Sequence, residues 1–224
     1  MSLLIATPCY GGMATEAYMS SCDVLRQAFV AGGYPHDILR LTKESLITRA
    51  RNVCASSFLF ETEFDILGFI DADIEFSVDD VALAVQRVVE CRDPIAVGAY
   101  RNKSIDAPLA VWKDSQLIDL KDIKEPTTID FAGTGFMFIH RRVFEKMMKV
   151  HPEWEYDEGM PLETWNGERG KCWAFFQDPI VEWTDGSRYH QSEDYFFCEQ
   201  ARELGFEVTV HPDIKLKHWG SHAY

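Results

Sequence analysis

The sequence predicts a single α/β domain in which helices flank a central, mostly parallel sheet. Apolar runs and amphipathic segments alternate along the first hundred residues, which is the order of elements that builds a parallel sheet. A chain of 224 residues with 46% hydrophobic residues also has the right size for one well-filled core. The sequence contains no repeat, linker or low-complexity segment, so we expect one domain over residues 1–224.

The first half supplies the clearest elements. Short apolar runs predict buried strands at residues 3–6, 38–41, 66–70 and 95–99. Apolar residues at three- and four-residue spacing predict helices at 15–31 and 45–60. Ser77 followed by Asp80 resembles a capping box and predicts a third helix that runs through Val88. Thr7-Pro8 is expected to end the first strand in a loop, at the sheet edge where such folds bind ligands.

The second half shows a different pattern and predicts a smaller antiparallel element. Residues 108–129 are polar and resemble a hairpin, and a glycine-interrupted apolar run at 131–139 predicts a strand. Helices are expected at 141–150 and 193–204, with a last strand at 208–210. Residues 151–189 hold four of the six tryptophans with little periodicity, which predicts a long ordered loop region over a site.

Composition excludes some classes of partner. The net charge of −14 opposes binding to a phosphate backbone, so a nucleic-acid partner is disfavoured. The six cysteines form no C-x-x-C pair, which predicts free thiols in a reducing compartment rather than a zinc ribbon or a disulfide framework. The apolar start is too short for a signal peptide, and no later segment approaches a membrane span. We expect a cytoplasmic protein, or one of the host cytoplasm if the source is a virus.

The strongest local signal is Asp71-Ala72-Asp73, directly after the predicted strand at 66–70. Two carboxylates one residue apart at a strand end can both turn toward one cation. Acid pairs are also common in ordinary turns, and the motif alone does not separate the two interpretations. Its position favours the metal site, because acids at strand ends of a parallel sheet lie where ligands bind.

Ile70-Asp71-Ala72-Asp73-Ile74 resembles the D-x-D element of glycosyltransferases with the GT-A fold, and other motifs follow in that family's order over nearly the whole chain. The resemblance extends to small, membrane-free glycosyltransferases of large DNA viruses and phages. It implies a nucleotide-binding half at 1–103 and an acceptor- and sugar-binding half at 104–224. The donor-binding residues that it implies are Thr7, Pro8, Tyr10, Arg49, Arg51, Asn52, Asp71, Lys103, Gly133 and Gly135.

The same resemblance implies a metal site. Asp71, Asp73 and a C-terminal His218 would hold Mn²⁺ or Mg²⁺ against the diphosphate of a nucleotide sugar, UDP-linked by default. Asp71 would reach mainly the ribose, whereas Asp73 would bind the metal directly. An imidazole ligand favours Mn²⁺ over Mg²⁺, because nitrogen suits the softer ion. From the residues alone, a surface histidine in a frayed tail is the favoured interpretation of His218.

An acid pair follows Ser192 at the start of the predicted helix at 193–204. By resemblance, Asp194 is the base of an inverting transfer to an acceptor hydroxyl, and Glu193 orients the acceptor. A retaining enzyme would use these carboxylates differently, and the sequence does not decide the stereochemistry. Carboxylates are also favoured at a helix start by capping and by the macrodipole, so a structural role stays open.

Two competing functions remain. A nucleotidyltransferase also joins acidic metal ligands to this kind of sheet, but Gly11-Gly12 is followed by no Lys or Arg before Arg26, so a basic phosphate loop is missing. A non-catalytic module that binds nucleotide sugars or carbohydrates would keep the fold without turnover. Release of nucleotide from a sugar donor would separate a transferase from such a module.

Overall fold

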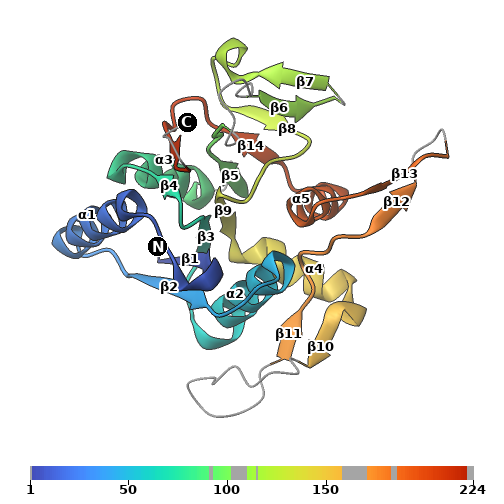
Figure 1. Cartoon of the computed structure of the whole chain (residues 1–224), viewed down its shortest axis with the longest axis horizontal. Coiled ribbons are helices and arrows are strands. Elements are labelled where there is room, and N and C mark those ends of the chain that lie inside the picture. Colours follow the sequence, from blue (N-terminus) through green and yellow to red (C-terminus); the bar gives the residue numbers. More distant parts are fainter. Residues whose placement is uncertain are drawn as a thin grey trace.

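The computed structural model describes residues 2–90, 93–101, 110–114, 116–157, 171–182 and 186–220 (Figure 1). The helices are α1 (Glu16–Gly32), α2 (Ile47–Glu61), α3 (Val78–Val89), α4 (Arg141–Val150) and α5 (Glu193–Glu203), with 3₁₀ turns η1 (Tyr10–Gly12), η2 (Leu120–Asp122) and η3 (Pro152–Trp154). The strands of the central sheet are β1 (Leu3–Cys9), β2 (His36–Thr42), β3 (Ile66–Ile70), β5 (Ile95–Val97), β8 (Thr127–Ile129), β9 (Phe136–His140) and β14 (Val208–Val210).

Within the described residues, the central sheet has seven strands in the order β2-β1-β3-β9-β5-β14-β8. β1 pairs in parallel with β2 and β3, and β14 pairs in parallel with β5. β9 lies between β3 and β5 and runs antiparallel to both, and β8 runs antiparallel to β14. The sheet is therefore mostly parallel, as predicted. Because β9 runs the opposite way, it begins at the edge where β3 and β5 end.

Helices cover both faces of this sheet and enclose two cores (Figure 1). On one face, α1 and α3 pack through residues such as Leu25 and Val85 against Ile70 of β3. On the other face, α2, α4 and α5 bury residues such as Phe58 and Phe197. The helix starts follow the sequence signals: Thr15 caps α1, and Ser77 with Asp80 forms the predicted capping box of α3.

The second half adds small antiparallel pairs around the central sheet. The pairs are β6 (Ala110–Lys113) with β7 (Gln116–Asp119), β10 (Glu155–Asp157) with β11 (Lys171–Trp173), β12 (Ile180–Glu182) with β13 (Arg188–His190), and β4 (Ile74–Glu75) with β15 (Lys217–His218). In Figure 1 the β12–β13 pair projects from the body of the molecule. The predicted antiparallel element is confirmed. The described part of residues 151–189 forms these short strands rather than an irregular loop.

Several strand boundaries differ from the prediction. β2 covers His36–Thr42 rather than 38–41, and β5 ends at Val97 rather than at residue 99. β1 continues through Pro8 to Cys9, where the sequence suggested a stop at Thr7-Pro8. Pro8 lies beyond Ala6, the last β1 residue paired with β3, and proline is tolerated where a strand has lost one neighbour. β9 begins only at Phe136, because the glycine-containing residues before it form a turn.

No helix in the described part of the chain is both long and apolar enough to cross a bilayer.

Candidate active site

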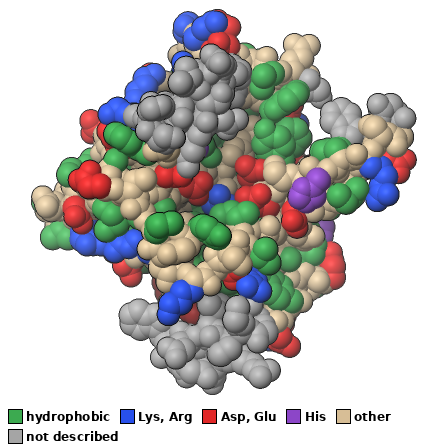
Figure 2. Space-filling model, viewed as in Figure 1, with side chains coloured by type: hydrophobic (Ala, Val, Ile, Leu, Met, Phe, Trp, Pro, Cys, Tyr) green, Lys and Arg blue, Asp and Glu red, His purple; other side chains and the backbone are tan. Residues whose placement is uncertain are grey.

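The predicted site residues gather at the carboxyl edge of the sheet, around the ends of β3 and β5 and the beginning of β9. Asp71 follows β3 directly, and its backbone N–H donates to the carbonyl of Gly135 over 3.0 Å. Gly133 and Gly135 therefore lie beside the D-x-D turn because β9 is antiparallel. In the space-filling view, acidic side chains gather near the middle of this face, with basic atoms among them (Figure 2).

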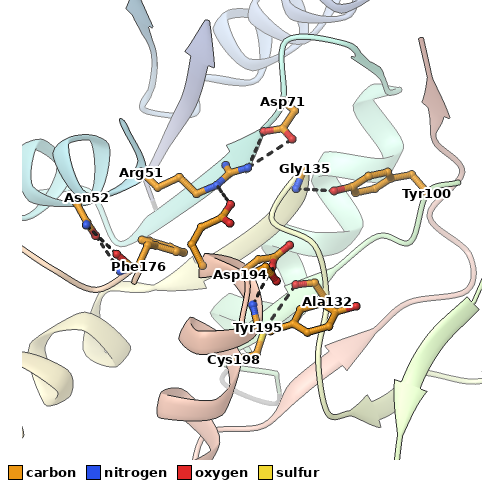
Figure 3. Close-up of polar contacts among 12 residues, drawn as sticks. Arg51, Asn52, Asp71, Tyr100, Ala132, Gly135, Phe176, Asp194, Tyr195 and Cys198 are labelled. Carbon is orange, nitrogen blue, oxygen red and sulfur yellow. Dashed lines mark hydrogen bonds and ion pairs between the residues drawn. The ribbon is translucent and has the colours of Figure 1, made fainter. Parts of the chain in front are cut away.

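A buried guanidinium joins two of the acids (Figure 3). Arg51, which is 4% exposed, donates from Nη2 to Asp71 Oδ1 over 3.1 Å and from Nε to Glu193 Oε1 over 3.3 Å. Although burial acts to lower the pKa of Arg51, the neighbouring carboxylates of Asp71 and Glu193 hold that pKa above its usual value. A permanent charge thus links the D-x-D turn to the start of α5, and Arg51 reaches Glu193 across 142 residues of the chain.

The second D-x-D carboxylate meets the C-terminal histidine. His218 Nε2 lies 3.4 Å from Asp73 Oδ1, and His218 Nδ1 lies 2.7 Å from the carbonyl oxygen of Arg101. Because a carbonyl only accepts, Nδ1 carries the proton, and a neutral ring then presents the lone pair of Nε2 to Asp73. A lone pair and a carboxylate oxygen face each other favourably only when a proton or a cation is shared between them.

These residues fit a divalent cation. Asp73 and His218 offer one oxygen and one nitrogen ligand, and the bond from Nδ1 to a backbone carbonyl is the usual support of a metal-binding histidine. The carboxylate of Asp71 is bonded to Arg51, so the predicted set of three is not assembled around one point. Among the described residues, no group of three or more His, Cys, Asp or Glu is placed to hold a metal ion. Substrate oxygens and water would have to complete the coordination.

Asp194 at the start of α5 is held differently from Glu193. Its Oδ1 accepts from the hydroxyl of Ser192 and, over 2.8 Å, from the backbone N–H of Tyr195. Burial raises the pKa of Asp194 above its usual range. The hydroxyl of Ser192 donates to this carboxylate, and the Ser192 side chain makes no capping bond to the helix. Asp194 Oδ2 takes part in neither of these two bonds. It is therefore the Asp194 oxygen able to accept a hydrogen bond from a ligand.

Asp194 lines a pocket of about 180 Å³. Its floor is formed by residues of β5 and by Val210 of β14, and its walls include Trp112, Tyr195 and Phe131. The rings of Tyr195 and Phe131 stack with their centroids 4.9 Å apart. The pocket combines one carboxylate with aromatic faces, which suits a small polar ring that also has an apolar side.

Tyr100 lies between this pocket and the histidine. Its ring packs edge-on against His218 with centroids 5.2 Å apart, and its hydroxyl accepts from the N–H of Gly135 over 3.0 Å. A Cβ atom at Gly133 or Gly135 would lie 2.6 or 2.4 Å from this hydroxyl. Both glycines are therefore needed for the close approach of Tyr100.

Comparisons with known proteins address the fold. No protein-family model matches this sequence, and a search of curated proteins finds no significant match. Solved structures do match: A197 from STIV superposes with a TM-score of 0.58 at 17% identity, over 98% of this chain and 86% of that one. GalNAc-T7, crystallised with UDP, GalNAc and Mn²⁺, matches with a TM-score of 0.55 at 11% identity over 97% of this chain. The chain has a GT-A fold.

A third structure with the GT-A fold matches along the full length of this chain. TarS 1-349 from S. aureus, in complex with UDP-GlcNAc, has a TM-score of 0.50 at 11% identity and matches 100% of this chain. The chain spans only 43% of the length of GalNAc-T7 and 62% of that of TarS. At these identities the likeness concerns the fold, and the activity of this chain is a separate question.

The other residues predicted to bind the donor lie at varied places in the fold. Thr7 is buried and its hydroxyl bonds to that of Tyr18 over 2.6 Å, so only its backbone is available to a nucleotide. Pro8 is partly exposed, and Tyr10 in η1 is 72% exposed. Arg49 donates from Nη2 to Glu44 over 2.9 Å.

Asn52 holds the loop after β11 against α2. Its amide group exchanges two hydrogen bonds with the backbone of Phe176, over 2.9 and 2.8 Å. Both polar atoms of Asn52 are therefore used inside the protein. Lys103 lies outside the described residues.

Several residues of the site were not predicted. Tyr100 directly follows the predicted strand at 95–99, as Asp71 follows the strand at 66–70, so the strand-end rule would have found it. Trp112 and Tyr195 carried no sequence signal, because the fold alone brings β6 and α5 together at the pocket. Trp173, one of the four tryptophans in the predicted loop region, lies in the core.

Proposed function

We propose that this chain is a divalent-metal-dependent glycosyltransferase that moves a sugar from a nucleotide-diphosphate donor to an acceptor hydroxyl. The observation that supports this most is the meeting of Asp73 with His218 on a GT-A fold, beside a partly buried Asp194. UDP is the first nucleotide to test, because GalNAc-T7 and TarS were crystallised with UDP and UDP-GlcNAc, respectively. Mn²⁺ is the first metal to test, because His218 offers a nitrogen ligand.

In this proposal the donor lies at the D-x-D turn. Asp73 and His218 would hold the metal, and Arg51 would keep the carboxylate of Asp71 directed to the donor ribose. A metal bound there would supply positive charge against the leaving diphosphate. The ring of Tyr100 covers the side of His218 that faces the pocket. The sugar of the donor would therefore lie between the D-x-D turn and Gly133.

The acceptor would enter the pocket beside Asp194. Its hydroxyl would donate to Asp194 Oδ2, and its ring would rest against Trp112 and Tyr195. As the new glycosidic bond forms, Asp194 takes the hydroxyl proton, and the bond to the diphosphate breaks. Glu193, paired with Arg51, fixes the orientation of the helix start. Donor and acceptor on opposite sides of the anomeric carbon give inversion.

The experiment is incubation of the protein with UDP-, GDP- and TDP-sugars and Mn²⁺, with nucleotide release as the measurement. Slow release from one donor, abolished by EDTA and in Asp73→Asn, is the expected result, because transferases often hydrolyse their donors without an acceptor. Binding without release would identify a non-catalytic module. Formation of labelled nucleoside triphosphate from a nucleotide sugar and labelled pyrophosphate would identify a nucleotidyltransferase.

A further inference from the structure

The C-terminal segment that carries His218 is attached to the strand directly after the D-x-D turn. β15 pairs with β4 in antiparallel register, Lys217 opposite Glu75 and His218 opposite Ile74. The N–H of Trp219 then donates to the carbonyl of Asp73 over 2.8 Å. A pairing of two residues is too short to hold a chain end by itself, since isolated two-stranded pairs are marginal in water.

The side chain of Glu75 attaches this C-terminal segment further. Glu75 Oε1 accepts from Lys217 Nζ over 2.6 Å, and Glu75 Oε2 accepts from Trp219 Nε1 over 2.7 Å. Both donors come from the residues on either side of His218. Hydrogen bonds to an ionised carboxylate are stronger than neutral ones, and each of these two uses a separate oxygen.

The geometry of the strand explains why this attachment orients the histidine. Successive residues of a strand point to opposite faces, so Lys217 and Trp219 project toward Glu75 while His218 projects away from it. On that other side His218 meets Asp73, the carbonyl of Arg101 and the ring of Tyr100. Fixing both neighbours of His218 therefore fixes the direction of its ring.

We propose that Glu75 is the positioning residue of the metal site: it clamps Lys217 and Trp219 and thereby presents His218 to the cation shared with Asp73. This inference rests on the proposed function. Glu75 bonds the two neighbours of His218, so its effect on the metal passes through the C-terminal segment. The metal affinity should depend on the clamp, not on the charge of Glu75 as such.

The test measures the Kd of Mn²⁺ by electron paramagnetic resonance in the presence of UDP. Glu75→Ala should raise this Kd by roughly 10- to 100-fold, the usual effect of removing a group that supports a metal ligand. Trp219→Phe keeps a ring and loses one donor, so a rise of roughly 3- to 10-fold is expected. Glu16→Ala is the matched control, because Glu16 is an exposed acid that lines the same groove as Glu75 and Trp219. Its Kd should equal that of the wild type.

Lys217→Met separates a clamp from a simple charge effect. If Glu75 merely attracts the cation, removing the positive charge of Lys217 should tighten Mn²⁺ binding. If Glu75 is a clamp, the same change should weaken it. Tighter binding in Lys217→Met, or a wild-type Kd in Glu75→Ala, would overturn the proposal.

A metal-free measurement keeps this inference distinct from the proposed function. Hydrogen exchange at the amide of Trp219 should be faster in Glu75→Ala than in the wild type or in Glu16→Ala, with the rest of the protein unchanged. Wild-type protein that binds no Mn²⁺ would overturn the proposed function. Unchanged exchange at Trp219 would overturn the clamp whether or not the metal binds.

Discussion

Some charged residues of the site form an ion-pair network, whereas others keep an atom that can accept a hydrogen bond from a ligand. Arg51 donates to Asp71 from Nη2 and to Glu193 from Nε, whereas its buried Nη1 has no hydrogen-bond partner in the described part of the chain. Asp194, one residue further along, also lies in the field of Arg51, but its Oδ1 accepts from Ser192 and Tyr195, and it lines the pocket. The two adjacent acids therefore differ in their bonding, and we propose that Asp194 accepts the proton. That Glu193 orients the acceptor stays a prediction.

Asp194→Asn tests the base. Asparagine keeps the shape and is nearly as good as aspartate near a helix start, so the melting temperature should hardly change. Turnover should fall by roughly two to four orders of magnitude, because the amide cannot accept the acceptor's proton. The Kd of the donor should stay near the wild-type value. Near-normal turnover in a folded mutant would make Asp194 a residue of the helix start only, and Glu193→Gln would then be examined.

The pH dependence of the wild type gives a second test of the same carboxyl group. Because burial raises the pKa of Asp194, this side chain becomes protonated at a higher pH than an exposed aspartate. A base must be ionised, so kcat/KM should fall as the pH falls, with a midpoint above the ordinary value of 3.8. A profile that stays flat down to that value would argue against Asp194.

The contact of Tyr100 with the two glycines gives a prediction with an internal control. Gly133→Ala should destabilise the protein by about 1–3 kcal/mol, because the new Cβ meets the Tyr100 hydroxyl. In a Tyr100→Phe background the next atom is Cζ at 3.4 Å, so most of that cost should disappear. Gly135→Ala should not be rescued, since Cζ already lies 2.6 Å from its Cβ. Chemical denaturation of both glycine variants in each background measures this, and an equal cost of Gly133→Ala in the two backgrounds would contradict it.

At the scale of elements, local patterns predicted most of the fold. β3, α4 and β14 have the predicted bounds, and α3 begins at the predicted capping box. These elements carry their signals in neighbouring residues. The insertion of β9 between β3 and β5 depends on pairing between segments about seventy residues apart, and no local pattern specifies it. The same limit applies to the site: the D-x-D turn is visible in the sequence, whereas the aromatic pocket requires the fold.

The C-terminal segment is the element on which the metal prediction depends. Removal of residues 217–224 should weaken Mn²⁺ and donor binding far more than it lowers stability, because the described part of this segment, residues 217–220, is short and has Trp219 as its one large apolar side chain. We expect at least a roughly tenfold rise in the Kd of the Mn²⁺–UDP complex, and a loss of about 1–2 kcal/mol in unfolding free energy. Full donor affinity in the shortened chain would mean that His218 is not a metal ligand.

At the scale of the whole molecule, strands from both halves of the sequence form one sheet, and the candidate site lies where they meet. Asp71 and Asp73 come from the first half, and Gly135, Asp194 and His218 come from the second. The identity to these solved structures is only 11–17%, so the likeness is one of fold. The sequence therefore predicted a donor class by resemblance but no acceptor.

The central claim is that Asp73 and His218 bind a divalent cation together with a nucleoside diphosphate. Isothermal titration of UDP into wild-type protein, with and without Mn²⁺, and into folded Asp73→Asn tests it most directly. Binding to the wild type should require Mn²⁺ and should be lost in Asp73→Asn, with an unchanged melting temperature of the unliganded protein. UDP binding of equal affinity with and without Mn²⁺, or undiminished Mn²⁺-dependent binding in Asp73→Asn, would contradict it.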